Sequence, residues 1–259
     1  MWKTIKENLN ESKMIIYVVI STCLVDEVSC KCLIDCVTFA TSNKYKHILV
    51  IDDTPEDGID IYQLKFPSYV KIIKNQYKKS GEITRIWYFW KYAHKGDYGI
   101  LIHDSTFINT HIPIFKYDFI PLFSFEHIWD DTRNEKSFFK EYPKLLKMYN
   151  EKNKWKGCFG VQYEITWDFV DKVMKTYPDL FEELLSKVKT RNLRSCMERV
   201  IQVIFLSISS NTNESIYGTI HDYTTRYYGK SFGVDYNIFH ENELYSKQHM
   251  PIIKVWVGR

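Results

Sequence analysis

Short apolar runs and amphipathic segments alternate along the first hundred residues of the chain. Four runs have the length and composition of strands: residues 14–20 (MIIYVVI), 47–51 (HILVI), 69–73 (YVKII) and 98–102 (YGILI). The continuous β-branched run 14–20 is typical of a central parallel strand that is buried on both faces. Residues 27–42 and 82–93 lie between such runs and carry apolar side chains at helical spacing. The alternation predicts an α/β fold of the Rossmann-like kind, with a mostly parallel central sheet flanked by helices.

The pattern changes after residue 109. Residues 111–131 are rich in proline and aromatic residues without a clean period, so we expect a loop-dominated segment that covers a cleft. A strand is expected at 155–163, and helices are expected at 134–150 with an interruption at Pro143, from Thr166 onwards, at 181–188 and at 193–206. Residues from 207 onwards are expected to form a tail.

Composition narrows the class of protein. Apolar residues make up 45% and charged residues 26% of the 259, which is typical of a soluble globular chain. A net charge of +3, with no run of more than two basic residues, argues against a dedicated nucleic-acid binder. No secretory signal is recognised, and the apolar run at 14–25 is shorter than the roughly 20 residues of a membrane span.

The cysteines indicate a reducing environment. Cys23, Cys30, Cys32 and Cys36 cluster in sequence but lack the paired C-x-x-C spacing of a zinc site. We therefore expect free thiols and a cytoplasmic location.

Familiar nucleotide and hydrolase motifs are missing. The turn after the first predicted strand reads STCLVD, without the G-x-G-x-x-G that brings a backbone against a pyrophosphate. The chain also has no P-loop, no G-x-S-x-G elbow and no H-E-x-x-H. Any nucleotide site must therefore be built without a glycine-rich first turn.

Polar residues at the ends of the predicted strands are the candidates for such a site, because α/β folds bind ligands there. A carboxylate can accept hydrogen bonds from a ribose or base, while a cation and a backbone amide can face phosphates. The candidates for donor binding are Ser21, Asp52, Asp53, Lys79, Gly81, Arg85, His103 and Ser105. The alternative is that Asp52 and Asp53 belong to a solvated turn and that Lys78 and Lys79 belong to a solvated basic loop.

His103-Asp104-Ser105 is the most informative trio, because it directly follows an apolar strand. A carboxylate in that place can hold Mg²⁺ or Mn²⁺, which would bridge a diphosphate and stabilise its departure. The alternative is an Asp104 that caps a turn beside a hydrogen-bonded His103.

Taken together, these segments resemble the GT-A class of nucleotide-sugar glycosyltransferases. The resemblance covers residues 14–206, and within the class the chain is most similar to small glycosyltransferases of large DNA viruses. A viral origin would place the protein in the host cytoplasm. It implies one GT-A-like domain, 1–259, with a nucleotide-binding half at 1–109 and an acceptor-binding half, including the tail, at 110–259. The chain departs from the class at the acidic motif, where His103-Asp104-Ser105 replaces Asp-x-Asp.

The resemblance also implies roles for later residues. Glu198 is the candidate base that deprotonates an acceptor hydroxyl, with a salt bridge to Arg194 or Arg199 as the alternative; Glu164 and Asp168 rank below it. Asp104 joins Glu198 as a catalytic candidate, and Asp104 and His221 are the candidate metal ligands. Segment 155–166 (WKGCFGVQYEIT) would close the sugar pocket. Three aromatic residues are candidates for stacking on acceptor sugars, with core packing as the alternative: Trp129, Trp155 and Tyr163.

The sequence thus predicts a glycosyltransferase that uses a nucleotide sugar, taken as a UDP-sugar, a divalent cation (Mn²⁺ or Mg²⁺) and a glycan or glycoprotein acceptor. Glu198 favours inversion at the anomeric carbon. Three alternatives remain: a nucleotidyltransferase, a methyltransferase, which would normally need a glycine-rich first turn, and a non-catalytic carbohydrate-binding module. No oligomeric state follows from the sequence.

Overall fold

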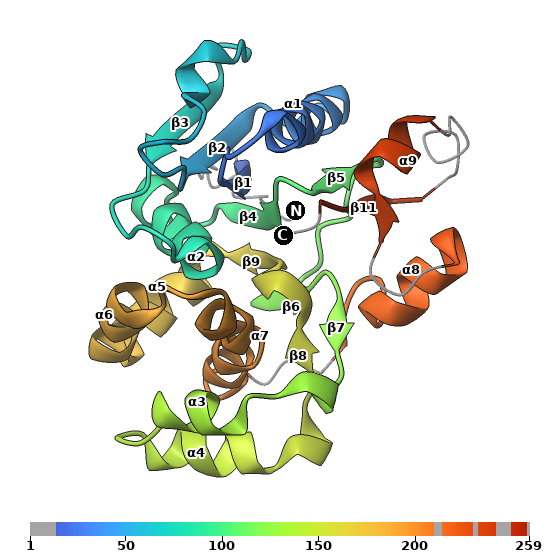
Figure 1. Ribbon diagram of the computed structural model, residues 1–259. Helices are drawn as coiled ribbons and strands as arrows, with labels where there is room; N and C mark the ends of the chain where they lie inside the picture. The colour runs from blue at the N-terminus through green and yellow to red at the C-terminus, as the bar shows by residue number, and fades with distance from the viewer. Residues whose placement is uncertain (1–13, 210–213, 230–232, 242–249, 258–259) are drawn as a thin grey trace, which may run out of the picture.

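A computed structural model describes residues 14–209, 214–229, 233–241 and 250–257 (Figure 1). Its main sheet has six strands in the order β3-β2-β1-β4-β9-β6. In that order the strands are Val70–Lys74, His47–Asp52, Ile16–Thr22, Tyr98–His103, Tyr163–Thr166 and Phe119–Pro121. The first four are parallel, and β9 runs antiparallel to both neighbours. The predicted fold class, a mostly parallel sheet flanked by helices, is confirmed.

The strands are apolar on both sides because each side covers a different core. Along β1, Val18 and Ile20 join one buried cluster and Val19 joins the other. Leu101 on β4 faces the same side as Val19, while Ile100 faces the opposite side. A continuous apolar run, rather than an alternating one, is the pattern that this double burial requires.

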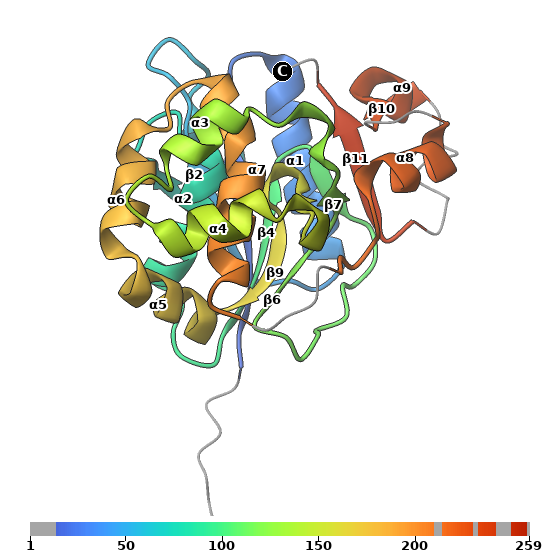
Figure 2. The same cartoon turned by 90° about the horizontal axis from the view of Figure 1, so that it is seen from below.

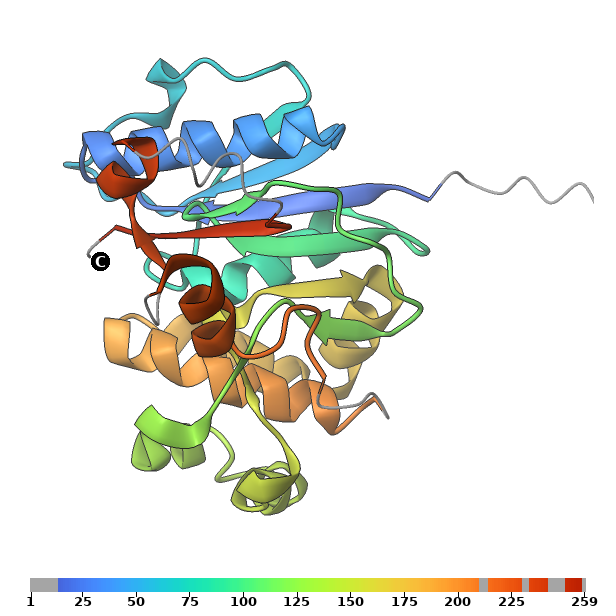
Figure 3. The same cartoon turned by 90° about the vertical axis from the view of Figure 1, so that its right-hand side faces the viewer.

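The helices divide between the two faces of the sheet (Figures 1 and 3). Helix α1 (Glu27–Ser42) covers one face and contacts β5 (Thr106–Ile108). The other face is covered by α2 (Gly81–Tyr92), α5 (Trp167–Thr176), α6 (Pro178–Lys187) and α7 (Arg191–Leu206). The sequence predicted all five helices to within a few residues, and the Thr166 cap is present, with its hydroxyl accepting from the Phe169 N–H at 3.2 Å.

The helical segment expected at 134–150 forms two helices, and the expected interruption at Pro143 is confirmed. Helix α3 (Thr132–Ser137) ends before a short link, and α4 (Pro143–Asn150) starts at the proline. Proline is tolerated at the first position of a helix, where its missing N–H has no partner to lose. Pro143 therefore begins a second helix instead of bending one. Both helices contact α7 and lie in front of it when the molecule is seen from below (Figure 2).

The prediction of a single strand at 155–163 is wrong in the middle of that segment. Strand β8 (Gly157–Cys158) pairs with β7 (Ser124–Phe125), and a tight turn at Phe159–Val161 separates it from β9. Gly160 has φ +63°, a left-handed conformation in which a strand cannot continue. Short single turns complete this region and the β2–β3 connection: η1 (Ile61–Gln63), η2 (His127–Trp129) and η3 (Lys152–Lys154).

The C-terminal part is not a tail where the structure describes it. It forms α8 (Ile220–Tyr228), β10 (Val234–Asp235), α9 (Tyr236–Glu241) and β11 (Ile252–Trp256). Strand β11 lies between β10 and β5 in a second, three-stranded sheet, with Ile252 opposite Ile108. Pairing between residues so far apart in the chain leaves no local signal, which explains the error.

Two further findings concern membrane spans and cysteines. Over the described residues, no helix combines the length and the apolar character needed to cross a bilayer. The cysteines of the described segments are free thiols, as expected.

Candidate active site

The ends of three neighbouring strands form one polar edge. Strand β1 lies between β2 and β4, and its last residues pair across both: Thr22 with Asp52, and Ser21 with His103. From β1 the chain continues to β2 and β3 on one side of the sheet, and it then crosses to β4 on the other side of β1. That is the topological switch point at which open α/β sheets bind ligands, beyond the carboxyl ends of the strands.

Hydrogen bonds join the two groups of polar residues that the sequence placed at this edge. The Thr22 hydroxyl donates to Asp104 Oδ2 at 2.8 Å. The Asp104 N–H donates to the Ser21 carbonyl at 3.2 Å, and the Asp53 N–H donates to the Thr22 carbonyl at 2.9 Å. Thr22 is therefore hydrogen-bonded both to the paired aspartates and to the His-Asp-Ser corner.

The two aspartates after β2 have different environments. Asp52 is buried, and its Oδ1 accepts from the Thr54 N–H at 3.0 Å, so it closes a turn as in the structural alternative. Asp53 is half-buried, and its Oδ1 accepts from the Asn75 amide at 3.0 Å and from the Lys79 N–H at 2.8 Å. Burial raises the pKa of Asp53, against the opposing effect of these two donors.

The loop before α2 brings two more candidates to this edge. Lys79 has φ +66° and is held there by Asp53, with its side chain exposed. A Cβ on Gly81 would lie 3.7 Å from Asp53 Oδ2 and 3.8 Å from Ser21 Oγ. Gly81 therefore borders both polar strand ends, and its small size keeps the space between them open.

Arg85 acts on the site through the backbone of a turn. Its side chain is fully buried, and its Nη2 donates to the Gly160 carbonyl at 2.5 Å and the Val161 carbonyl at 3.3 Å. Burial lowers the pKa of Arg85 to about 10, so it stays charged at neutral pH. The sequence suggested that Arg85 faces the phosphates of a donor. Its side chain is instead buried and bonded to backbone carbonyls.

His103 shares the same carbonyl. Its Nε2 lies 2.9 Å from the Gly160 oxygen, a geometry in which the ring N–H donates. Burial, followed by the charges of Arg85 and Lys254, holds the pKa of His103 well below its usual range. His103 is therefore neutral at pH 7 and fixes the turn as a hydrogen-bond donor.

Glu198 completes this turn from the other side. The Gly160 N–H donates to Glu198 Oε1 at 2.8 Å, and Arg199 Nη1 donates to Oε2 at 2.8 Å. The Glu198 side chain is 13% exposed, and burial raises its pKa to about 7 against the opposing effect of Arg199. Glu198 thus has both the salt bridge of the structural alternative and the near-neutral pKa of a general base.

Arg199 is itself held by carboxylates. Its Nε donates to Asp130 Oδ1 at 2.9 Å, and its guanidinium lies 4.5 Å from the centre of the Phe125 ring. Arg194 instead lies with its Nε 3.4 Å from Glu82 Oε2. Of the two arginines proposed as partners of Glu198, Arg199 is the one in contact.

Lys254 was missed at the sequence level. It lies on β11, is buried, and its Nζ donates to Ser105 Oγ at 2.7 Å and to the Val255 carbonyl at 3.0 Å. A lysine inside the apolar run IIKVWV was the available signal, because a buried ammonium needs dedicated partners. It supplies a positive charge next to the His-Asp-Ser corner.

His221 lies on α8, where its ring centre is 5.8 Å from that of Phe125 and 5.7 Å from that of Trp129. Among the described residues, no three His, Cys, Asp or Glu side chains gather closely enough to hold a metal ion. One oxygen of Asp104 already accepts from Thr22. The protein donor set at this edge therefore does not fit Mg²⁺ or Mn²⁺, whose coordination needs several oxygen ligands.

The lower-ranked carboxylates lie elsewhere. Glu164 is in the middle of β9, opposite Ile100, and its Oε1 accepts from the Phe115 N–H at 2.8 Å. Asp168 accepts from the Gly96 N–H at 2.9 Å, near the start of β4. Neither contacts the turn that Glu198 holds, so Glu198 remains the candidate base.

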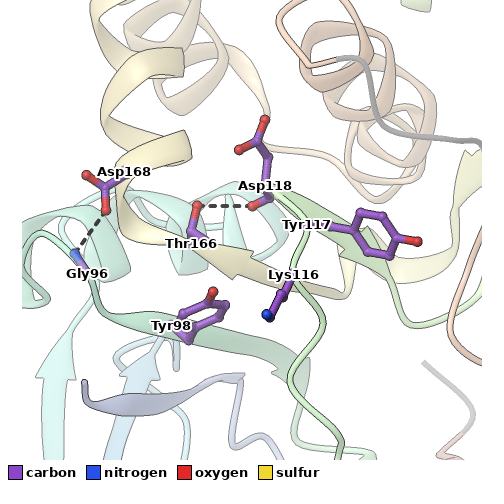
Figure 4. Close-up of a pocket in the computed structure, with 7 residues that line it drawn as sticks. All are labelled: Gly96, Tyr98, Lys116, Tyr117, Asp118, Thr166 and Asp168. Carbon is purple, nitrogen blue, oxygen red and sulfur yellow. Dashed lines mark hydrogen bonds between the residues drawn. The ribbon is translucent and has the colours of Figure 1, made fainter. Parts of the chain in front are cut away.

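A pocket of about 380 Å³ lies at the opposite edge of the sheet (Figure 4). Tyr98, at the start of β4, and Thr166, at the end of β9, line it together with Lys116 and Asp118. This is the amino edge of the parallel strands, so the pocket is separate from the candidate site at their carboxyl ends.

No family model matches the chain, and no curated protein sequence matches it. Among solved structures, the chain is similar to one described as the crystal structure of the galactosyltransferase LgtC in complex with donor and acceptor sugar analogues. That similarity covers 93% of this chain and 87% of that chain, at 7% sequence identity and a TM-score of 0.45.

Proposed function

We propose that this protein is a glycosyltransferase of GT-A-like architecture that moves a sugar from a nucleotide-sugar donor, a UDP-sugar, to a hydroxyl of a glycan or glycoprotein. The observation that carries the proposal is the bonding of Thr22 to both groups of polar residues at the switch point. Glu198, with a pKa of about 7, reaches the same edge through Gly160.

Each strand end has a role in binding the donor. Asp53 and the backbone around Gly81 line the space expected for the nucleoside, bordered by Ser21 and by the exposed Lys79. Ser105, hydrogen-bonded to the Lys254 ammonium, lies at the end expected for the diphosphate. Arg85 and His103 position the Gly160 turn between donor and acceptor.

The transfer step needs a base and a stabilised leaving group. Glu198 takes the proton of the acceptor hydroxyl, and the hydroxyl oxygen forms a bond to the anomeric carbon of the donor sugar. The bond from that carbon to the phosphate oxygen breaks at the same time. The nucleoside diphosphate leaves with the electron pair of that bond, and its negative charge is favoured by the nearby Lys254 ammonium. Attack opposite the leaving group inverts the anomeric carbon.

The described residues offer few ligands to the expected divalent cation. Asp104 is the one carboxylate of the trio, and one of its oxygens is engaged by Thr22. An ion here would take most of its ligands from water and the donor, so no step of the reaction is assigned to it.

Nucleotide release tests the proposal. The protein is incubated with a panel of UDP-sugars and, separately, with nucleoside triphosphates. We expect release of UDP, and we expect Glu198→Gln to reduce this release at least about 100-fold. The matched control is Asp168→Asn, which changes a carboxylate at the opposite edge. Pyrophosphate release would instead indicate a nucleotidyltransferase, and no turnover of either substrate would contradict transferase activity.

A further inference from the structure

One large exposed aromatic side chain, Trp129, is connected to the candidate base through two intervening residues. Of the three aromatic residues considered for sugar stacking, Trp155 and Tyr163 are buried in the core, while Trp129 is 57% exposed. Its ring centre lies 5.9 Å from that of Phe125 and 5.7 Å from that of His221. The structure thus separates one candidate surface residue from two core residues.

An unbroken series of contacts leads from this indole to the candidate base. Phe125, next to Trp129, lies under the Arg199 guanidinium, and Arg199 bonds Glu198 Oε2 at 2.8 Å. Phe125 also lies 6.0 Å, centre to centre, from Phe159, which immediately precedes Gly160. Packed aromatic side chains therefore connect Trp129 to the turn at the candidate active site.

The turn that carries Trp129 is anchored on both sides. His127 is 2.9 Å from Asp130 Oδ2 through Nδ1 and 2.9 Å from the Trp155 carbonyl through Nε2. Asp130 is bonded in turn by Lys152 and Arg199. Burial would raise the pKa of Asp130, but the hydrogen bonds from His127 and Lys152 outweigh it and hold this pKa below its usual range. A side chain presented by such a turn loses little conformational freedom when a ligand binds.

We propose, on the basis of the proposed function, that Trp129 and His221 form the acceptor subsite, with the buried Phe125 packed against both rings, and that the acceptor is a carbohydrate. A pyranose has an apolar C–H face that fits an indole and a rim of hydroxyls that fits an imidazole and a carboxylate. The exposed apolar patch, Trp129 with Ile128, is far smaller than the roughly 800 Å² that each partner buries in a stable protein interface.

Glycan binding measured without any donor tests this inference. The full chain is applied to an oligosaccharide array, and the glycans that bind are titrated against the wild type, Trp129→Ala, Trp129→Phe and Tyr62→Ala. We expect affinity to fall at least about tenfold in Trp129→Ala and less in Trp129→Phe, because phenylalanine keeps an aromatic face. Tyr62→Ala, which removes another exposed ring on the β2–β3 connection, leaves affinity unchanged.

The outcomes distinguish this subsite from the proposed reaction. Equal glycan affinity in Trp129→Ala and wild type overturns the subsite, and so does a wild type that binds no oligosaccharide. Trp129-dependent glycan binding in a protein that turns over no UDP-sugar supports the subsite and contradicts the glycosyl transfer. Because the proposed donor and acceptor regions are distinct, we expect a UDP-sugar to raise the melting temperature of the wild type and of Trp129→Ala by the same amount.

Discussion

The Thr22 hydroxyl and the Asp104 carboxylate are joined by a buried hydrogen bond of 2.8 Å, between the end of β1 and the residue after β4. Their elements are neighbours in the sheet but 82 residues apart in sequence. The bond fixes the direction of the Asp104 side chain at the edge where the proposed donor binds. It also supplies a polar partner to a carboxylate that would be costly to bury alone.

Replacing Thr22 by valine removes this bond while keeping the side-chain volume. We expect the free energy of unfolding to fall by about 1–3 kcal/mol, because a buried acceptor loses a donor. Urea denaturation measures the change. Thr38→Val is the matched control: its hydroxyl bonds the Ile34 carbonyl on the exposed side of α1, and we expect almost no change. Equal losses in the two variants would show that Thr22 has no special role.

Gly160 should be intolerant of any side chain for two separable reasons. Its φ of +63° disfavours other residues, and an added Cβ would lie 2.9 Å from His103 Nε2. Gly96 provides the control, because its φ is +87° and an added Cβ would meet no atom within 4 Å. We expect Gly96→Ala to cost about 1 kcal/mol of stability through the backbone alone, and Gly160→Ala to cost about 1–3 kcal/mol more.

A double variant tests the cause of that additional loss. In His103→Ala the imidazole is gone, so adding Gly160→Ala to it should cost about the same as Gly96→Ala in the wild type. The measurement is again the free energy of unfolding from urea titration. If the Gly160→Ala penalty is the same with and without the imidazole, steric contact with His103 is not its origin.

Local patterns were sufficient for the first half of the fold and insufficient for the second. Apolar runs bounded by turn residues identified β1 to β4. Of these strands, β1, β2 and β4 are buried on both faces, while β3, at the edge of the sheet, is only partly buried. The 155–163 segment failed because one left-handed residue, Gly160, divides it, and glycine alone does not reveal its φ. The pairing of β5 with β11 was not predicted, because the paired residues are more than 140 positions apart in the sequence.

The site shows the same division. The alternation of strands and helices implied a parallel sheet in which polar residues at the strand ends would meet, and those at the ends of β1, β2 and β4 do. The sequence could not show that Arg85 would be buried against a backbone carbonyl, since an arginine in the second turn of a helix looks the same when it faces solvent. Lys254 reaches the corner only through long-range strand pairing, so its position could not be derived from neighbouring residues.

The pH dependence of transfer should identify Glu198 as the base. Burial raises its pKa to about 7, so its carboxylate form, which accepts the proton, increases as pH rises through 7. We expect kcat/KM for the acceptor to rise with pH with a midpoint near 7. Glu198→Gln should lose this rising limb together with at least about 100-fold in rate, while the exposed Glu141→Gln keeps both. A limb that persists in Glu198→Gln would assign the titration to another group.

Glu164 should make stability depend on pH without taking part in the proposed reaction. Its Oε1 accepts from Phe115, its Oε2 makes no hydrogen bond within the described residues, and burial raises its pKa to about 7. Because the folded pKa exceeds the unfolded value of 4.5, the folded state holds the proton more tightly. The contribution to stability is therefore complete below pH 4.5 and is lost as pH rises to about 7.

The substitution Glu164→Gln isolates this effect from other carboxyl groups whose pKa is also raised by burial, such as Glu198. Glutamine can accept from the Phe115 N–H but does not titrate, so the variant should gain stability relative to the wild type by about 3 kcal/mol between pH 4.5 and pH 8. Urea denaturation across that range measures the difference between the two proteins. A difference that stays constant with pH would mean that Glu164 ionises as easily in the folded protein as in the unfolded chain, and that water reaches its carboxylate within β9.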